Sequence, residues 1–216
     1  MEDLSEQSIK EDCPHCNSSS QAFRYPLEEL DEFYIICDSH PIVEGHILII
    51  PKIHITCIAD FPEDLYKKFL QLNQKVSQFL IKEYNTVSCF EHGILGQTVF
   101  RSHVHYLPFK GKITAIIPEG EIHLIKLHNL SQLKTIFKKD KGYLFFSIGK
   151  NLWSVDPKIS APRFFRDRFA KALGRPERGN WKKMHTNEIL TKEAEKDARE
   201  TQTKWKNYFI RRKISR

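Results

Sequence analysis

Residues 96–108 read GQTVFRSHVHYLP, and this stretch decides the fold. Its alternation predicts a β-strand, because successive side chains of a strand point to opposite faces of the sheet. Arg101, His103 and His105 then share one face, with about 7 Å between neighbours. The apolar side chains are expected on the core face: Phe100, Val104 and Tyr106. Imidazole and guanidinium groups gain nothing from a dry interior, so their face is a candidate site, with a solvated polar strand face as the alternative.

The same stretch resembles the signature strand of the histidine triad (HIT) family, whose motif is His-x-His-x-His followed by two apolar residues. His103 takes the place of the middle histidine, which is the nucleophile of the family, and His105 takes the place of the third. Arg101 stands where the first histidine would be, so the triad is degenerate, Arg-x-His-x-His. The resemblance implies a HIT-like fold and a nucleotide substrate.

The resemblance also implies roles for these side chains in phosphoryl-type transfer. His103 would attack the α-phosphorus of a nucleotide and form a nucleotidyl-histidine intermediate, which water or a second acceptor resolves. His105 would hydrogen-bond the α-phosphate oxygens or give a proton to the leaving group. Gln97 and Thr98 would bind oxygens as charge builds, and Arg101 would add a permanent positive charge that favours phosphate.

A second match to the family covers residues 38–54, DSHPIVEGHILIIPKIH. The resemblance places Asp38 against the ribose and His46 near the catalytic strand. It also places Glu91, at the end of another expected strand, near the ribose or the phosphates. Two plainer interpretations stay open, in which Asp38 is a turn residue and Glu91 is a solvated strand end.

Cys13 and Cys16 form a Cys-x-x-Cys knuckle whose spacing lets both sulfurs bind one tetrahedral Zn²⁺. Some branches of the family complete such a site with a histidine after Pro-Lys, here His54, and with the first histidine of the triad. Arg101 cannot take that last place because it stays protonated. Zinc then needs a different fourth ligand, for which there are three candidates: His15, His92 or water. A redox pair and an incidental pair of thiols are the alternatives to zinc.

The rest of the chain alternates between strand-like and helix-like segments. Strands are expected at residues 33–38, 45–51, 87–93, 113–117, 121–127, 143–148 and 152–155. Helices are expected at residues 61–84, 131–138, 160–173 and 187–211. Asp60 is expected to cap the first helix, with Glu63 completing a capping box, and Glu91 to Gly93 to lead into the catalytic strand by a tight turn. This order indicates an α+β fold, an antiparallel sheet packed against the long first helix.

Two domains are predicted: a HIT-like nucleotide-binding domain over residues 1–110 and an α/β extension over 111–216 that ends in a basic helix. The extension contains FFR at 164–166, ALG at 172–174 and NWK at 180–182. These segments are similar to a C-terminal module that follows the HIT domain in branches related to diadenosine polyphosphate phosphorylases and in splicing-associated HIT proteins.

The net charge of +7 is unevenly distributed along the chain. Residues 158–216 carry 18 Lys and Arg against 7 Asp and Glu, a balance of +11, which leaves −4 for the preceding residues. A field of this sign attracts phosphate-rich ligands, so nucleic acid is a candidate partner of the C-terminal part. A solvated basic surface without a specific partner is the alternative.

Cysteine usage and hydropathy suggest a cytoplasmic protein that does not enter a membrane. The chain has five cysteines, an odd number, and three of them lie singly within apolar runs, which indicates reduced thiols. No run of about 18 apolar residues occurs. The first six residues, MEDLSE, are acidic where a secretory signal would be basic and then apolar.

Three functional hypotheses follow. The first is a nucleotide hydrolase or nucleotidyl transferase that cleaves a phosphoanhydride or phosphoramidate at the α-phosphate, with a dinucleoside polyphosphate as the model substrate. The second is a non-catalytic module that binds a nucleotide or RNA, and the third is a structural zinc scaffold. HIT proteins often form homodimers with a continuous sheet, but an extension of this length could cover the sheet edge instead.

Overall fold

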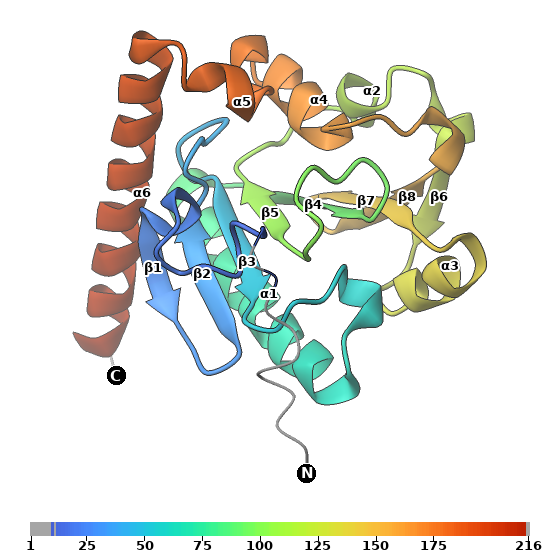
Figure 1. Ribbon diagram of the computed structural model, residues 1–216, viewed down its shortest axis with the longest axis horizontal. Coiled ribbons are helices and arrows are strands. Elements are labelled where there is room, and N and C mark those ends of the chain that lie inside the picture. Colours follow the sequence, from blue (N-terminus) through green and yellow to red (C-terminus); the bar gives the residue numbers. More distant parts are fainter. Residues whose placement is uncertain (1–9, 11, 215–216) are drawn as a thin grey trace.

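The computed structural model describes residues 10 and 12–214 (Figure 1). Within these residues, eight strands form one antiparallel sheet in the order β1-β2-β3-β5-β4-β7-β8-β6. The strands are β1 (Pro26–Glu29), β2 (Phe33–Cys37), β3 (Ile47–Pro51), β4 (Ser88–Gly93), β5 (Val104–Leu107), β6 (Leu124–Leu127), β7 (Tyr143–Ile148) and β8 (Asn151–Val155). The prediction of an α+β fold is confirmed.

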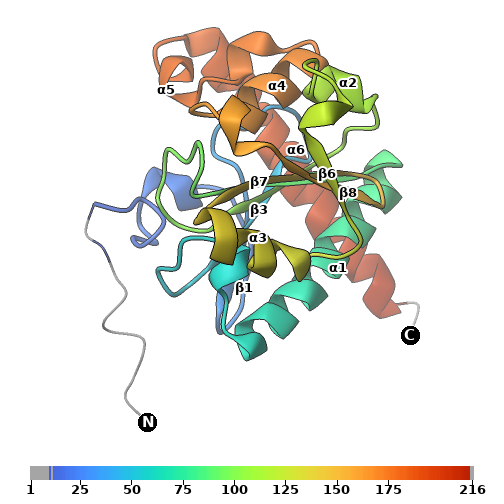
Figure 2. The same cartoon turned by 90° about the vertical axis from the view of Figure 1, so that its right-hand side faces the viewer.

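Six α-helices in the described part of the chain surround the sheet. They are α1 (Glu63–Tyr84), α2 (Ile113–Ile116), α3 (Gln132–Asp140), α4 (Phe164–Ala172), α5 (Trp181–Met184) and α6 (Glu188–Ile214). Five 3-10 turns join them: η1 (Gln21–Phe23), η2 (Ile58–Asp60), η3 (Glu121–His123), η4 (Pro157–Ile159) and η5 (Pro176–Arg178). Figure 2 shows the sheet between the group α2, α4 and α5 on one side and the pair α1 and α3 on the other.

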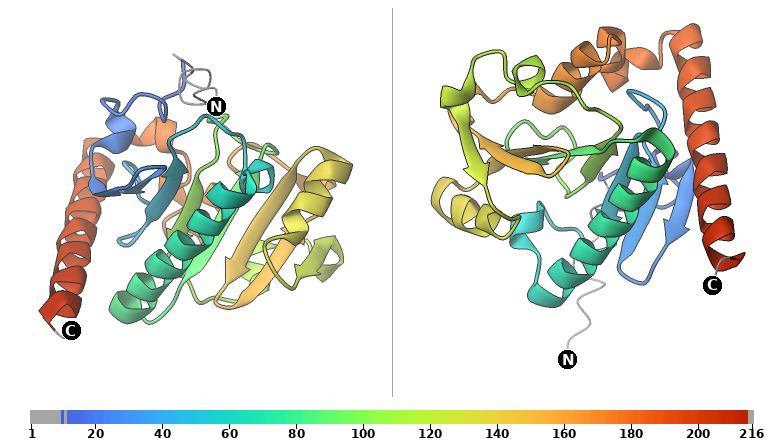
Figure 3. Two further views of the ribbon diagram at one scale, coloured as in Figure 1. Left: turned by 90° about the horizontal axis from the view of Figure 1, so that it is seen from below. Right: turned by 180° about the vertical axis from the view of Figure 1, so that it is seen from behind.

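Each face of the sheet has its own apolar core, because side chains alternate along every strand. One core joins α1 and α3 to the face that carries Val104, Tyr106 and Phe145. The other joins α2 and α4 to the face that carries Phe90 and Phe146. Figure 3 shows α1 crossing the first face and α6 standing beside β1 at the edge of the sheet.

Helix α1 forms as the apolar spacing predicts. Its inward side chains are all buried: Leu65, Phe69, Leu72, Val76, Phe79 and Leu80. It ends at Asn85, whose left-handed conformation (φ 61°) returns its N–H to the carbonyl of Ile81. The predicted start is wrong. Pro62 is the N-cap and Asp60 lies in η2, so the expected capping box does not form.

The stretch that decides the fold is shorter as a strand than its alternation suggests. β5 begins at Val104, and residues 94–103 form a loop in place of the expected tight turn. Phe100 lies in this loop and is 65% exposed, so its predicted core position is wrong. Gly96 adopts φ +74°, and a Cβ there would lie 2.5 Å from the carbonyl oxygen of Ala161. A positive φ and this close approach take the backbone out of the sheet.

Residues 113–117 were expected to form a strand, and this prediction is wrong. They form α2, a single turn whose Ile116 is fully buried in the second core. A run rich in isoleucine fits a strand or a buried helical turn equally well by composition, and here packing against α4 decides. The segment 121–127 is also divided, with η3 preceding a shorter β6.

The strands after residue 110 extend the same sheet. β7 pairs with β4 along its whole length, from Ser88↔Ile148 to Gly93↔Tyr143, and β8 and β6 follow. The sheet thus continues across residue 110, and the division of the chain into two domains there stays a prediction. Among the described residues, the helices are too short or too polar to cross a bilayer. The acidic segment MEDLSE lies outside the described residues.

Candidate functional site

The site lies where β5 meets the loop between β2 and β3, on the sheet face that α4 covers. His105, on β5, stacks on Phe90 of β4 with ring centroids 4.3 Å apart. The backbone N–H of Ile42 donates to Nδ1 of His46 (3.1 Å), and burial lowers the pKa of His46 to about 4. This neutral ring therefore carries its hydrogen on Nε2 and donates it to Nδ1 of His105 (2.9 Å). His105 in turn holds its own hydrogen on Nε2.

His103 immediately precedes β5 and is also buried. Its Nδ1 lies 2.6 Å from the carbonyl oxygen of Arg101. Burial lowers the pKa of His103, although this hydrogen bond and the charge of Asp38 raise it. A neutral imidazole can approach a carbonyl only by donating, so Nδ1 carries the hydrogen and Nε2 keeps its lone pair. His103 thus presents a nucleophilic nitrogen beside His105, whose ring centroid is 4.9 Å away.

Asp38 follows β2 and is paired with an arginine from the extension. Arg166, on α4, donates from Nη1 to Oδ2 of Asp38 and from Nη2 to the carbonyl of His40 (2.7 Å). The other carboxylate oxygen accepts the backbone N–H of His40 (2.9 Å). Although burial favours the neutral acid, Arg166 and then His46 hold the pKa of Asp38 well below its usual range. A buried carboxylate stays ionised here because a buried guanidinium compensates it.

A cavity of about 180 Å³ opens over these groups. Its walls come from three parts of the chain that are far apart in sequence. The N-terminal segment contributes Pro14, His15, Ser20, Gln21 and Ala22. The HIT-like part contributes Asp38, Ser39, His40, Leu48, Thr98, Val99, His103 and His105. The extension contributes Arg166, Trp181 and His185.

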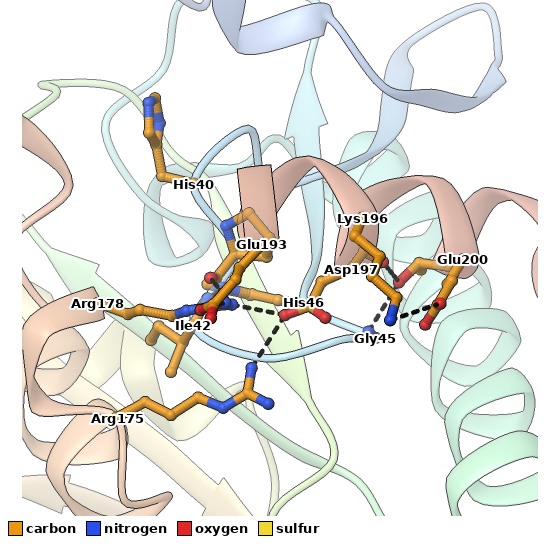
Figure 4. Close-up of polar contacts among 12 residues, drawn as sticks. His40, Ile42, Gly45, His46, Arg175, Arg178, Glu193, Lys196, Asp197 and Glu200 are labelled. Atoms are coloured by element: carbon orange, nitrogen blue, oxygen red, sulfur yellow. Dashed lines mark hydrogen bonds and ion pairs between the residues drawn. The ribbon is translucent and has the colours of Figure 1, made fainter. Parts of the chain in front are cut away.

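The extension also fixes the loop between β2 and β3 (Figure 4). Arg178 is 2% exposed and donates to the carbonyl of Pro41 (3.3 Å). On α6, Asp197 and Glu193 both accept from this guanidinium. Further along α6, the hydroxyl of Thr201 accepts the N–H of Gly45 (2.8 Å). These contacts hold both ends of the loop that positions His40 and His46.

Residues 26–112 match the family model described as "HIT domain". These residues form a HIT domain. An adenosine 5'-monophosphoramidase of Candida albicans is 30% identical over 100 residues, 43% of this chain and 66% of that protein. An adenylylsulfatase of Arabidopsis thaliana is 27% identical over 108 residues, 48% of this chain and 55% of that protein. The chain spans about half to two thirds of the length of the curated relatives it matches.

Among solved structures, a HIT family member from Bacillus subtilis is 26% identical, with a TM-score of 0.41. The similarity covers 47% of this chain and 76% of that one. The matched HIT domain ends at residue 112, so Arg166, Trp181 and His185 lie beyond it. Sequence reasoning noticed the FFR segment but gave Arg166 no role. The available signal in the sequence for a role of Arg166 was that this arginine directly follows two phenylalanines.

Three residues predicted to contact the nucleotide form hydrogen bonds with other parts of the protein. Arg101 is 1% exposed, and its guanidinium donates to the carbonyls of His15, Pro51 and Lys52, so it fastens the N-terminal knuckle to the end of β3. Gln97 donates from Nε2 to the carbonyl of Thr56 (2.9 Å). Their nucleotide contacts remain predictions, as does that of Thr98, which lines the cavity.

Glu91, the third, lies on the sheet face opposite the cavity. Its carboxylate accepts from the hydroxyls of Ser102 (2.6 Å) and Tyr143 and from the N–H of Ile58. Burial raises the pKa of Glu91 to about 7. Since Ser102 directly precedes His103, this carboxylate braces the backbone that leads into β5.

The three side chains expected to bind zinc lie close together. One donor atom from each of Cys13, Cys16 and His54 lies within 4.8 Å of the others, and Cys16 Sγ is 3.1 Å from His54 Nδ1. Two sulfurs and one imidazole at this separation fit three corners of a zinc tetrahedron. Neither predicted protein candidate for the fourth corner is turned to it. The His15 ring packs on His103 with centroids 5.0 Å apart, and Nε2 of His92 accepts the N–H of Phe165.

Proposed function

We propose that this protein is a nucleotide hydrolase or nucleotidyl transferase in which Nε2 of His103 attacks the α-phosphorus. The observation that carries the proposal is the hydrogen bond from Nδ1 of His103 to the carbonyl of Arg101, which leaves the lone pair on Nε2. Burial keeps this imidazole neutral, and a neutral imidazole is the nucleophilic form. The backbone contact also orients the ring for in-line attack.

The step forms a bond between Nε2 of His103 and phosphorus and breaks the bond from phosphorus to the leaving group, which takes the electron pair. His105 supports it through the hydrogen on Nε2, which contacts an α-phosphate oxygen or follows the leaving group. The hydrogen bonds from the N–H of Ile42 to His46 and from His46 to Nδ1 of His105 fix that hydrogen on Nε2 of His105. Water or another acceptor then displaces His103 and releases the nucleotide.

Substrate class is proposed from chemistry shared with the relatives. The names adenosine monophosphoramidase and adenylylsulfatase both describe a leaving group on an adenylyl phosphate, through nitrogen in one protein and oxygen in the other. We therefore propose nucleotide phosphoramidates and phosphoanhydrides, dinucleoside polyphosphates included, as substrates. Asp38, ionised and on the cavity wall, is proposed to accept from the ribose hydroxyls.

Zinc is proposed as a structural ion held by Cys13, Cys16 and His54. When bound, the ion would cross-link the N-terminal segment to the loop after β3. Arg101 already ties the same two segments together. The knuckle in turn places His15 against the cavity.

The predicted macromolecular partners remain proposals. Gln202 of α6 donates to the carbonyl of Pro26, so this helix lies along β1, one of the two edge strands through which a homodimer could continue the sheet. Basic residues of α6 are partly paired with acidic ones, as Lys204 is with Glu44 and Arg199 is with Glu195. Nucleic acid binding would depend on the remaining positive field and fall steeply with salt.

The experiment that tests the proposal compares three histidine variants on adenosine phosphoramidate. His103→Asn should lower kcat by about 10⁴-fold or more, because the covalent route is lost. His105→Asn should lower kcat by about 10²-fold, because this residue assists without bonding to phosphorus. His123→Asn, in η3 and paired with Asp156, is the matched control and should keep full activity. Near-normal turnover by His103→Asn would end the assignment.

A further inference from the structure

The cavity contains a cluster of three aromatic rings that the proposed chemistry does not use. The cluster consists of His40, from the loop after β2, and of Trp181 and His185, from the extension. Ring centroids are 4.2 Å apart for His40 and His185, 5.9 Å for His40 and Trp181, and 6.2 Å for Trp181 and His185. All three residues line the same cavity as His103 and His105.

This ring cluster differs from a core contact. Trp181 and His40 are half-buried and His185 is exposed, so the rings face the opening of the cavity and not a dry interior. The backbone of His40 is nevertheless fixed, because its N–H donates to Asp38 and its carbonyl accepts from Arg166. Figure 4 shows the His40 ring directed away from the ionic network of α6. The ion pair of Asp38 and Arg166, which lines the cavity, thus also positions His40.

The remaining cavity wall provides a separate apolar surface. Ala22 and Leu48, with Val99 from the loop before β5, belong to segments other than those of the ring cluster. A nucleoside base held on that wall would leave the ring cluster free. Nζ of Lys182 lies 5.5 Å from the centroid of the Trp181 ring, so the ring cluster also carries a positive charge beside it. A flat ring attached to a phosphate chain matches both features.

We propose that Trp181, His40 and His185 form a subsite for a leaving group that carries a planar aromatic ring, such as the second nucleobase of a dinucleotide. This inference rests on the proposed function and makes it more specific: the extension selects the leaving group, and the HIT domain performs the transfer. Burial lowers the pKa of His40 to about 4, so the ring is uncharged at neutral pH and suited to stacking.

The test measures binding to the His103→Asn protein, which separates it from turnover. Diadenosine triphosphate and ATP are titrated by calorimetry, since ATP has the same three phosphates without the second adenosine. Diadenosine triphosphate should bind more tightly, and Trp181→Ala should weaken its binding by about tenfold while leaving that of ATP unchanged. Trp181→Phe keeps a ring and should recover most of the affinity. Lys183→Ala, an exposed neighbour on α5, is the matched control and should change neither ligand.

Two results would overturn the subsite. Equal losses of affinity for ATP and diadenosine triphosphate would assign Trp181 to the nucleotide's own base or to the fold. Unchanged binding of both ligands to Trp181→Ala and to His185→Ala would remove the ring cluster from recognition altogether. A wild-type protein that binds both ligands but turns over neither diadenosine triphosphate nor adenosine phosphoramidate would refute the proposed function alone, and the ratio of the two affinities would still decide the subsite.

Discussion

Replacing Arg166 with alanine tests the idea that the extension completes the active site. The side chains of Arg166 and Asp38 are 7% and 9% exposed, so the substitution leaves a carboxylate buried without its counter-charge. Breaking such a buried pair costs about 3–5 kcal/mol. For a chain of this length, that loss corresponds to a fall in Tm of roughly 6–20 °C. Without the guanidinium the pKa of Asp38 rises, and the proposed ribose acceptor is weakened.

The assay is urea unfolding at neutral pH, with Arg163→Ala as control. Arg163 pairs with Asp167 at the start of the same helix, but these side chains are 29% and 44% exposed, so the loss should be about 0.3–0.5 kcal/mol. The depressed pKa of Asp38 gives stability above about pH 4 that is lost as pH falls, so the defect of Arg166→Ala should shrink in acid. The double variant Arg166→Met with Asp38→Asn should recover much of the loss. A cost below about 1 kcal/mol for Arg166→Ala would refute the reasoning.

Three further predictions concern protonation and zinc. Because burial lowers the pKa of His103, kcat/KM should begin to fall in acid only below pH 6.5. The charge of Asp38 raises this pKa, so Asp38→Asn should move the fall to still lower pH. A fall that begins above pH 6.5 would contradict the prediction. Burial raises the pKa of Glu91 to about 7 from 4.5, so the wild type should lose stability relative to Glu91→Gln as pH rises between these values, by roughly 3 kcal/mol in urea unfolding; a constant difference would contradict it. Cys13→Ser should weaken zinc binding by at least about tenfold in a chelator competition, and unchanged affinity would exclude the knuckle as the site.

Local patterns in the sequence predict most of the sheet and its long helix. The spacing from Leu65 to Leu80 identifies α1, and the apolar runs identify β2, β3, β4, β7 and β8. The same patterns bring His46, His103 and His105 together, because two matched motifs fall on neighbouring strands. Hydrophobic periodicity and sequence motifs are properties of short segments, so both can be recognised without knowing how the rest of the chain folds.

The remainder depends on contacts between distant segments. Alternation continues through Arg101, yet residues 94–103 form a loop in which Gly96 adopts φ +74° and comes close to Ala161. Asp38 and Arg166 are 128 positions apart, and an ion pair between residues so far apart produces no periodic pattern in the sequence. Arg101 was expected to face phosphate on account of its charge, but a long side chain with five donors also suits three inward carbonyls.

The central claim is that His103 forms a covalent bond to the nucleotide. It is tested most directly by mixing the protein with adenosine phosphoramidate, quenching within one turnover, and mapping the mass of each peptide. The account predicts an adenylyl adduct on the peptide that contains His103, absent from His103→Asn and present in His123→Asn. Release of AMP by the wild type at its steady rate, with no adduct on His103 at any quench time, would contradict it.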